Sequence, residues 1–212
     1  MERKRGRLAT PWAAGVAGTV FAILTATAIV LVRLAVPSGA DGEAVTVDAG
    51  ERSAVRTALE LIPFAGIAFL WFMGALREQV GQREDRFVST VFLGSGLVFV
   101  AMLFGAAAAA SSVLDEGGQD SAFGRHVAYG LLTTYAMRMA AVFVMTTSTI
   151  GHRLGIIPRP LTVVGYLVGL TLLVVGSNVP WSELVFPAWV LVLSLHALWG
   201  RRSEVSRSAA SP

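Results

Sequence analysis

The chain has 212 residues, of which 54% are hydrophobic and 15% are charged, whereas soluble domains carry about 25% charged residues. This composition, with a mean hydropathy of +0.65, leaves too few polar residues to cover a soluble fold and predicts an integral membrane protein. The basic residues behind the net charge of +3 form no stripe with interleaved aromatic residues, which argues against nucleic-acid binding, and the lack of cysteine excludes thiolate chemistry and disulfides.

Six apolar runs follow one another along the chain. About 20 apolar residues are needed to cross some 30 Å of hydrocarbon, and backbone groups inside lipid must be hydrogen-bonded within the segment, which predicts helices rather than strands. The first run is too long for the apolar region of a cleaved signal peptide, so we expect it to remain as a helix. The six predicted helices cover residues 12–36, 55–76, 87–113, 126–150, 161–176 and 181–199. The predicted fold class is therefore all-α, a polytopic transmembrane bundle in one domain (residues 1–200), followed by a flexible cytoplasmic tail (residues 201–212).

The basic residues in the connecting segments predict an orientation. Loops on the cytoplasmic side are enriched in lysine and arginine, and a cytoplasmic N-terminus places 12 of the 17 basic residues on that side and four on the other. Tryptophans near the ends of the runs, such as Trp12, Trp71, Trp181 and Trp199, are typical of the membrane interfaces. We therefore expect a cell-membrane protein with both termini in the cytoplasm.

Arg138 is the most informative single residue, because it lies near the middle of the fourth run. Insertion scales put a central arginine at roughly 2.5–3.5 kcal/mol, and such residues usually face the bundle interior or a water-filled cavity. Thr134 and Tyr135 lie one turn away and can supply hydrogen bonds. One interpretation is a site for an anion or a lipid headgroup, and the other is a structural ion pair or a side chain that reaches the interface.

Glu60 is the expected partner of Arg138. At 1.5 Å per residue it lies roughly 10 Å nearer the outer face, and the arginine side chain leans toward its helix N-terminus, which closes part of that distance. A pair predicts that replacing both residues recovers some of the folded protein lost by replacing Arg138 alone. These four residues, Glu60, Thr134, Tyr135 and Arg138, form the candidate intramembrane polar site.

The sequence contains no recognisable metal-binding or catalytic motif. The histidines His126, His152 and His196 have no metal-binding spacing, and neither a phosphate-binding loop nor a nucleophile elbow occurs. We therefore expect no metal and no cofactor. The small-residue motif Gly165-xxx-Gly169 is typical of close helix packing and leaves open a homo-oligomer or a partner membrane protein.

The stretch 135–175, with Met137-Arg138-Met139-Ala140-Ala141-Val142-Phe143 and then Ile157-Pro158-Arg159-Pro160-Leu161, resembles a family of small multi-pass membrane proteins from high-GC bacteria. The similarity also takes in residues 83–105, about half of the chain in all. The resemblance implies a six-helix protein of the bacterial cell membrane. The family has no assigned activity, so it implies no functional residues.

Three functions remain open at this point. The favoured one is a non-enzymatic membrane or accessory protein, because no catalytic constellation is visible. The second is a small transporter or channel that uses Glu60 and Arg138, which requires a wet cavity reaching Arg138. The third is a lipid-acting membrane enzyme, which requires His152, His196 and the charged cluster around Asp85 to converge.

Overall fold

In the computed structural model the described residues are 3–35, 49–80, 86–115, 120–174, 179 and 181–209, and nearly all of them are helical. No strand occurs among them. The helices are α1 (Arg3–Ala35), α2 (Ala49–Val80), α3 (Arg86–Asp115), α4 (Asp120–Tyr129), α5 (Met137–Arg153), α6 (Arg159–Val174) and α7 (Val185–Ala209). The π-helix η2 (Gly130–Ala136) joins α4 to α5 as one continuous rod, and the short 3-10 helix η4 (Ser182–Leu184) precedes α7. The predicted all-helical fold, with six rods, is confirmed.

Five of these rods are long and apolar enough to cross a membrane, and α6 is a shorter apolar helix of 16 residues. The described residues of the predicted runs nearly all fall on helices, and at most of their ends the helices extend further, by one to ten residues. Helix α7 in particular continues to Ala209, where a flexible tail is the sequence-based expectation. Once a helix is nucleated, each added residue gains one hydrogen bond, which favours continuation beyond the apolar run. The loop of residues 37–48 and the charged cluster of residues 83–85 lie outside the described part of the chain.

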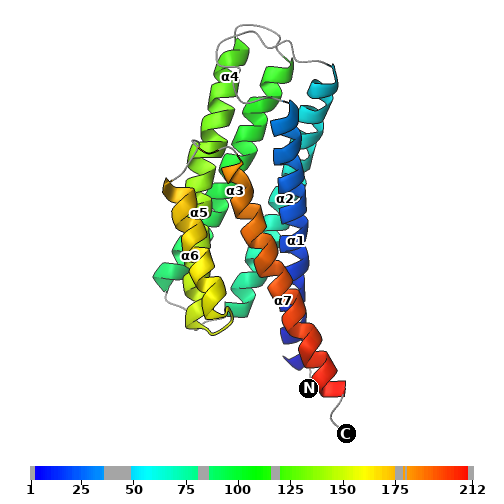
Figure 1. Ribbon diagram of the computed structural model, residues 1–212, viewed down its shortest axis with the longest axis vertical. Coiled ribbons are helices and arrows are strands. Elements are labelled where there is room, and N and C mark those ends of the chain that lie inside the picture. The colour runs from blue at the N-terminus through cyan, green and yellow to red at the C-terminus, as the bar shows by residue number, and fades with distance from the viewer. Residues whose placement is uncertain are drawn as a thin grey trace.

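The helices run antiparallel to their neighbours along the chain and form a bundle with both termini at one end (Figure 1). Helix α1 also packs against α7. A Cβ built on Gly15 would lie 2.6 Å from Leu198, while Arg33 at the other end of α1 contacts Glu183 just before α7. We call the end that holds Ala35, Ala49 and Asp115 the distal end, and the opposite end the terminal end.

Five phenylalanines from five different helices fill the centre of the bundle. Their ring centroids are 4.9–6.3 Å apart, which is the range of favourable aromatic pairs. All five side chains are fully buried. We call this group the phenylalanine layer: Phe21 on α1, Phe69 on α2, Phe99 on α3, Phe143 on α5 and Phe186 on α7. Since the layer joins every rod except α6, it defines a common level in the bundle.

Small residues allow the closest helix contacts. Gly165 and Gly169 of α6 are buried against α5, where added Cβ atoms would lie 2.0 Å from the Ser148 hydroxyl and 2.6 Å from Met145. The GxxxG motif therefore packs α6 within the chain, and it does not present a free surface for self-association.

The short helix α6 ends partway along the rod formed by α4, η2 and α5. Gly165 lies beside Ser148, and Gly169 lies beside Ala141 and Met145. Because the two helices are antiparallel, Val174 at the end of α6 lies near the level of Arg138. Figure 1 shows α6 and the start of α7 stopping well below the distal ends of α3 and α4. The distal part of the bundle is therefore built mainly from α1, α2, α3 and α4.

Candidate functional site

Arg138 lies on the outer surface of the bundle and not in its interior. Its side chain is exposed, and its Nη1 donates a hydrogen bond of 3.2 Å to the carbonyl oxygen of Thr134. The expectation that Arg138 faces inward is wrong. The reason is the length of its helix: the rod extends well past the end of α6, so a residue at its middle is not at the middle of the bundle.

Glu60 is also exposed, on the outer face of α2. The rings of Phe69 and Phe143 are in contact at 4.9 Å and relate the levels of the two helices. Glu60 is nine residues and Arg138 five residues on the distal side of this contact, so Glu60 lies about 6 Å further toward the distal end. Helix α3 packs against both α2 and α5, and no ion pair joins Glu60 to Arg138 in the described part of the chain. The expected pair is therefore not formed within the chain.

The other two residues of the sequence-predicted site, Tyr135 and Thr134, differ in exposure. Tyr135 is 59% exposed on the outer face, and Thr134 is half-buried and provides the carbonyl that Arg138 binds. Of the four predicted residues, Thr134, Tyr135 and Arg138 thus lie together on one helix surface, and Glu60 lies apart from them.

Four hydroxyl residues follow Arg138 on α5, Thr146, Thr147, Ser148 and Thr149, and the three threonines among them are hydrogen-bonded within their own helix. The side chains of Thr146, Thr147 and Thr149 donate hydrogen bonds of 2.7–2.8 Å to backbone carbonyls one turn earlier. Such bonds satisfy the hydroxyl within its own helix. Thr149 also contacts the Tyr166 hydroxyl at 2.8 Å, which ties α5 to α6.

A partly buried ion pair that the sequence interpretation missed joins α1 to the start of α7. The Nη2 atom of Arg33 lies 2.5 Å from Oε1 of Glu183, and their side chains are 19% and 4% exposed. The second carboxylate oxygen, Oε2, is buried and has no hydrogen-bond partner among the described residues. The contact is therefore made by one oxygen only, and not by the two parallel bonds of the strongest arginine–carboxylate pairs.

The backbone before Glu183 holds this carboxylate in the interior. Trp181 has a φ of 69°, the left-handed region that is unfavourable for a bulky residue. The turn is closed by hydrogen bonds from the Ser182 N–H to the Val179 carbonyl and from the Leu184 N–H to the Trp181 carbonyl. This left-handed residue directly precedes η4, in which Glu183 is buried.

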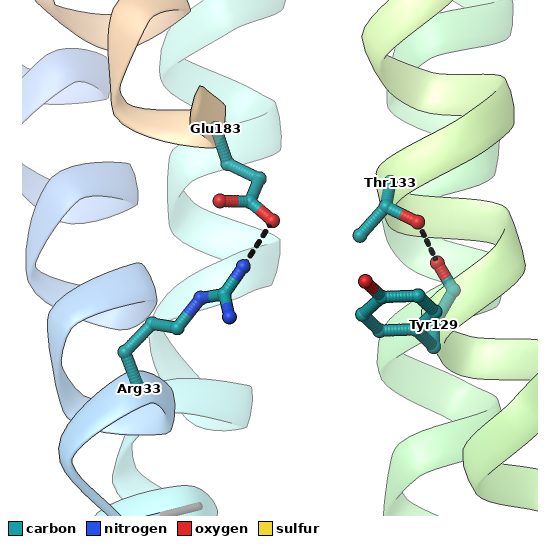
Figure 2. Close-up of polar contacts among 4 residues, drawn as sticks. All are labelled: Arg33, Tyr129, Thr133 and Glu183. Carbon is teal, nitrogen blue, oxygen red and sulfur yellow. Dashed lines mark hydrogen bonds and ion pairs between the residues drawn. The ribbon is translucent and has the colours of Figure 1, made fainter. Parts of the chain in front are cut away.

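Tyr129 and Thr133 face the ion pair from the opposite side of the bundle (Figure 2). Thr133 is buried and donates a 2.8 Å hydrogen bond to the carbonyl of Tyr129. Figure 2 shows the hydroxyl of Tyr129 directed toward the side where Arg33 and Glu183 lie. Tyr129 is 50% exposed although it is on the same helix face as buried Thr133, because the distal end is not covered by α6.

The rod formed by α4, η2 and α5 carries polar side chains on two different surfaces, and the π-helix η2 lies between them. Its wider turn changes the register of the helix, and π-helical insertions are frequent at functional sites. Residues before and within it, Tyr129 and Thr133, turn toward the ion pair, whereas Tyr135 and Arg138 at its other end are exposed on the outside. The helix propensities of residues 130–136 do not predict a π-helix at this position.

The described residues bring no catalytic group together. His126, His152 and His196 are all exposed, and no hydrogen bond joins any two of them in the described ranges. No group of three metal-binding side chains is found among the residues that were described. The chemistry that the arrangement offers is electrostatic: a partly buried ion pair toward the distal end, and an arginine with a neighbouring tyrosine on the outer surface.

The ion pair has a signal in the sequence that becomes clear only with the packing. Arg33 is the single charged residue in the first apolar run, and Glu183 is the single acidic residue between residues 160 and 203. Alternating helices place both at the same end of a bundle. The sequence does not show that α1 and α7 are neighbours, because no local pattern predicts which helices pack together.

No protein-family model, no curated protein and no solved structure matches the chain. The resemblance to the six-helix family of high-GC bacteria therefore stays an expectation.

Proposed function

We propose that this chain is a non-enzymatic, multi-pass protein of the cell membrane that acts as an accessory or assembly subunit and not as a conduit. The observation that carries the proposal is the phenylalanine layer. It fills the bundle centre with five buried rings, while the charges that a conduit would use, Glu60 and Arg138, lie on the outside.

In the proposed arrangement six helices cross the membrane, both termini are cytoplasmic, and the distal end faces the outside. The 12 basic residues on the terminal side and four on the other favour this orientation. Helix α6, about 24 Å long at 1.5 Å per residue, matches a thin hydrocarbon region, and Trp181 and Trp199 are exposed near the two ends of the last crossing. Arg138, at the level where α6 ends, then lies at the outer boundary of the hydrocarbon.

A transporter or channel is the alternative, and water access along the interior distinguishes the two. The chain has no cysteine, so Ala141→Cys is a single labelling site, and Phe123→Cys, which is exposed toward the distal end, is the positive control. We expect a water-soluble maleimide added from both sides to label Phe123→Cys and to leave Ala141→Cys unmodified, because Ala141 is fully buried. Labelling of Ala141→Cys at the rate of the control would show a hydrated interior and would replace our proposal with the conduit.

A further inference from the structure

Arg138 has hydrogen-bonding capacity that the protein does not use. A guanidinium has five N–H donors and no acceptor, and the hydrogen bond from Nη1 to the Thr134 carbonyl uses one of them. No carboxylate of the described residues forms an ion pair with Arg138. Because the side chain is exposed, the remaining donors are accessible from the surroundings of the protein, where the proposed membrane placement puts the lipid.

The side chain is directed toward the outer headgroups. Helical side chains lean toward the helix N-terminus, which for this rod is the distal end, and the bond to Thr134 one turn earlier shows that Arg138 follows this rule. Its Cα lies at the level where α6 ends. A long basic side chain at this depth reaches the interface while its methylene groups stay in hydrocarbon.

The surface around Arg138 resembles the boundary between headgroups and acyl chains. Tyr135 is 59% exposed nearly one turn earlier on the same outer face, and a tyrosine ring with an apolar body and a hydroxyl donor suits this boundary. Toward the terminal end, the exposed surface of α6 is apolar and is formed by Val163, Val164, Leu167, Leu170, Leu173 and Val174. Polar donors above an apolar surface are the complement of a phospholipid.

We propose that Arg138 and Tyr135 bind the phosphate group of an anionic phospholipid in the outer leaflet. This inference rests on the membrane placement of the proposed function. The guanidinium binds two phosphate oxygens, a geometry for which arginine is well suited, and the Tyr135 hydroxyl donates a further hydrogen bond. Glu60 is on a different helix face, so no carboxylate of the described residues is placed to bind the cation of a choline headgroup. The site therefore selects a lipid with net negative charge.

The test measures lipid retention by native mass spectrometry of the full-length protein in neutral detergent, titrated with phosphatidylglycerol or phosphatidylcholine. We expect the wild type to hold one phosphatidylglycerol in preference to phosphatidylcholine. Arg138→Gln should weaken phosphatidylglycerol binding about tenfold, because charge-assisted hydrogen bonds are lost. Arg138→Lys should retain part of the binding, and Tyr135→Phe should weaken it less. Arg125→Gln, an exposed arginine nearer the distal end of the same rod, is the matched control and should bind as the wild type does.

Three results would overturn the inference: unchanged phosphatidylglycerol binding in Arg138→Gln, equal retention of the two lipids, or an equal loss in Arg125→Gln. A further arm uses millimolar inorganic phosphate. If it displaces the lipid, the site binds soluble anions and the lipid assignment is wrong. If Arg138→Gln does not fold, phosphatidylglycerol binding by Arg138→Lys and Tyr135→Phe provides the same test: weakened binding supports the inference and unchanged binding overturns it. The maleimide labelling of Ala141→Cys is independent of lipid, so a failure here is separable from a failure of the proposed function.

Discussion

At the scale of single residues, the charges of this protein have two different roles. Arg33, which is half-buried, pairs with the buried Glu183 and connects α1 to the start of α7. Arg138 and Glu60 are exposed on separate helices and do not form an ion pair with each other. Burial of an ion pair costs desolvation energy that its own attraction only partly offsets. The pair therefore specifies which helix ends meet more than it adds to stability.

The ion pair gives a prediction for stability. Glu183→Leu or Arg33→Leu alone should lower the free energy of unfolding by about 3–5 kcal/mol, because each leaves an uncompensated charge in a largely buried position. The double variant, with two apolar residues, should recover most of that loss. Reversible unfolding in mixed micelles measures all three. Losses that simply add in the double variant would show that Arg33 and Glu183 are not coupled.

At the scale of helices, packing explains what sequence patterns alone do not predict. The apolar runs predict all six rods, since length and hydropathy are local properties. They do not predict which face of each rod is buried, because a helix in lipid is apolar on both its inner and its outer surface. Arg138 illustrates the problem. The insertion free energy of an arginine in the middle of an apolar run suggests that its side chain faces the bundle interior. Its position along the bundle, however, becomes clear only from where α6 ends. The π-helix and the left-handed Trp181 likewise depend on tertiary contacts.

Gly18 tests the packing of α1 against its two neighbours. A Cβ added there would lie 2.1 Å from the Ser194 hydroxyl of α7 and 2.7 Å from the ring of Phe72 on α2, and both side chains are buried. Gly18→Ala should therefore lower the unfolding free energy by about 1–3 kcal/mol through overpacking. Gly74→Ala on α2 is the control, because its added Cβ meets nothing within 4 Å, and it should stabilise by up to about 1 kcal/mol. A neutral Gly18→Ala would mean that α1, α2 and α7 are less closely packed than described.

At the scale of the whole molecule, the all-helical fold and the course of the chain follow from the six apolar runs. The residues expected to form one intramembrane site are only partly together: Thr134, Tyr135 and Arg138 share a surface, and Glu60 does not. In place of the expected inward site, the bundle centre holds the five buried phenylalanines, and an ion pair lies toward the distal end. That difference arises from helix lengths, since only the short α6 shows where along its neighbours Arg138 lies. Function is therefore proposed for the surface of the bundle and not for its centre.

The central claim is a membrane-crossing bundle whose two termini both lie in the cytoplasm and whose distal end lies outside. Single cysteines test it directly, at Ser38 and Gly118 for the outer side, and at Gly81 and at Ser208 near the end of α7 for the inner side. We predict that a membrane-impermeant maleimide labels Ser38→Cys and Gly118→Cys in intact cells, and labels Gly81→Cys and Ser208→Cys only after permeabilisation. Labelling of Ser208→Cys or Gly81→Cys in intact cells would contradict the proposed topology.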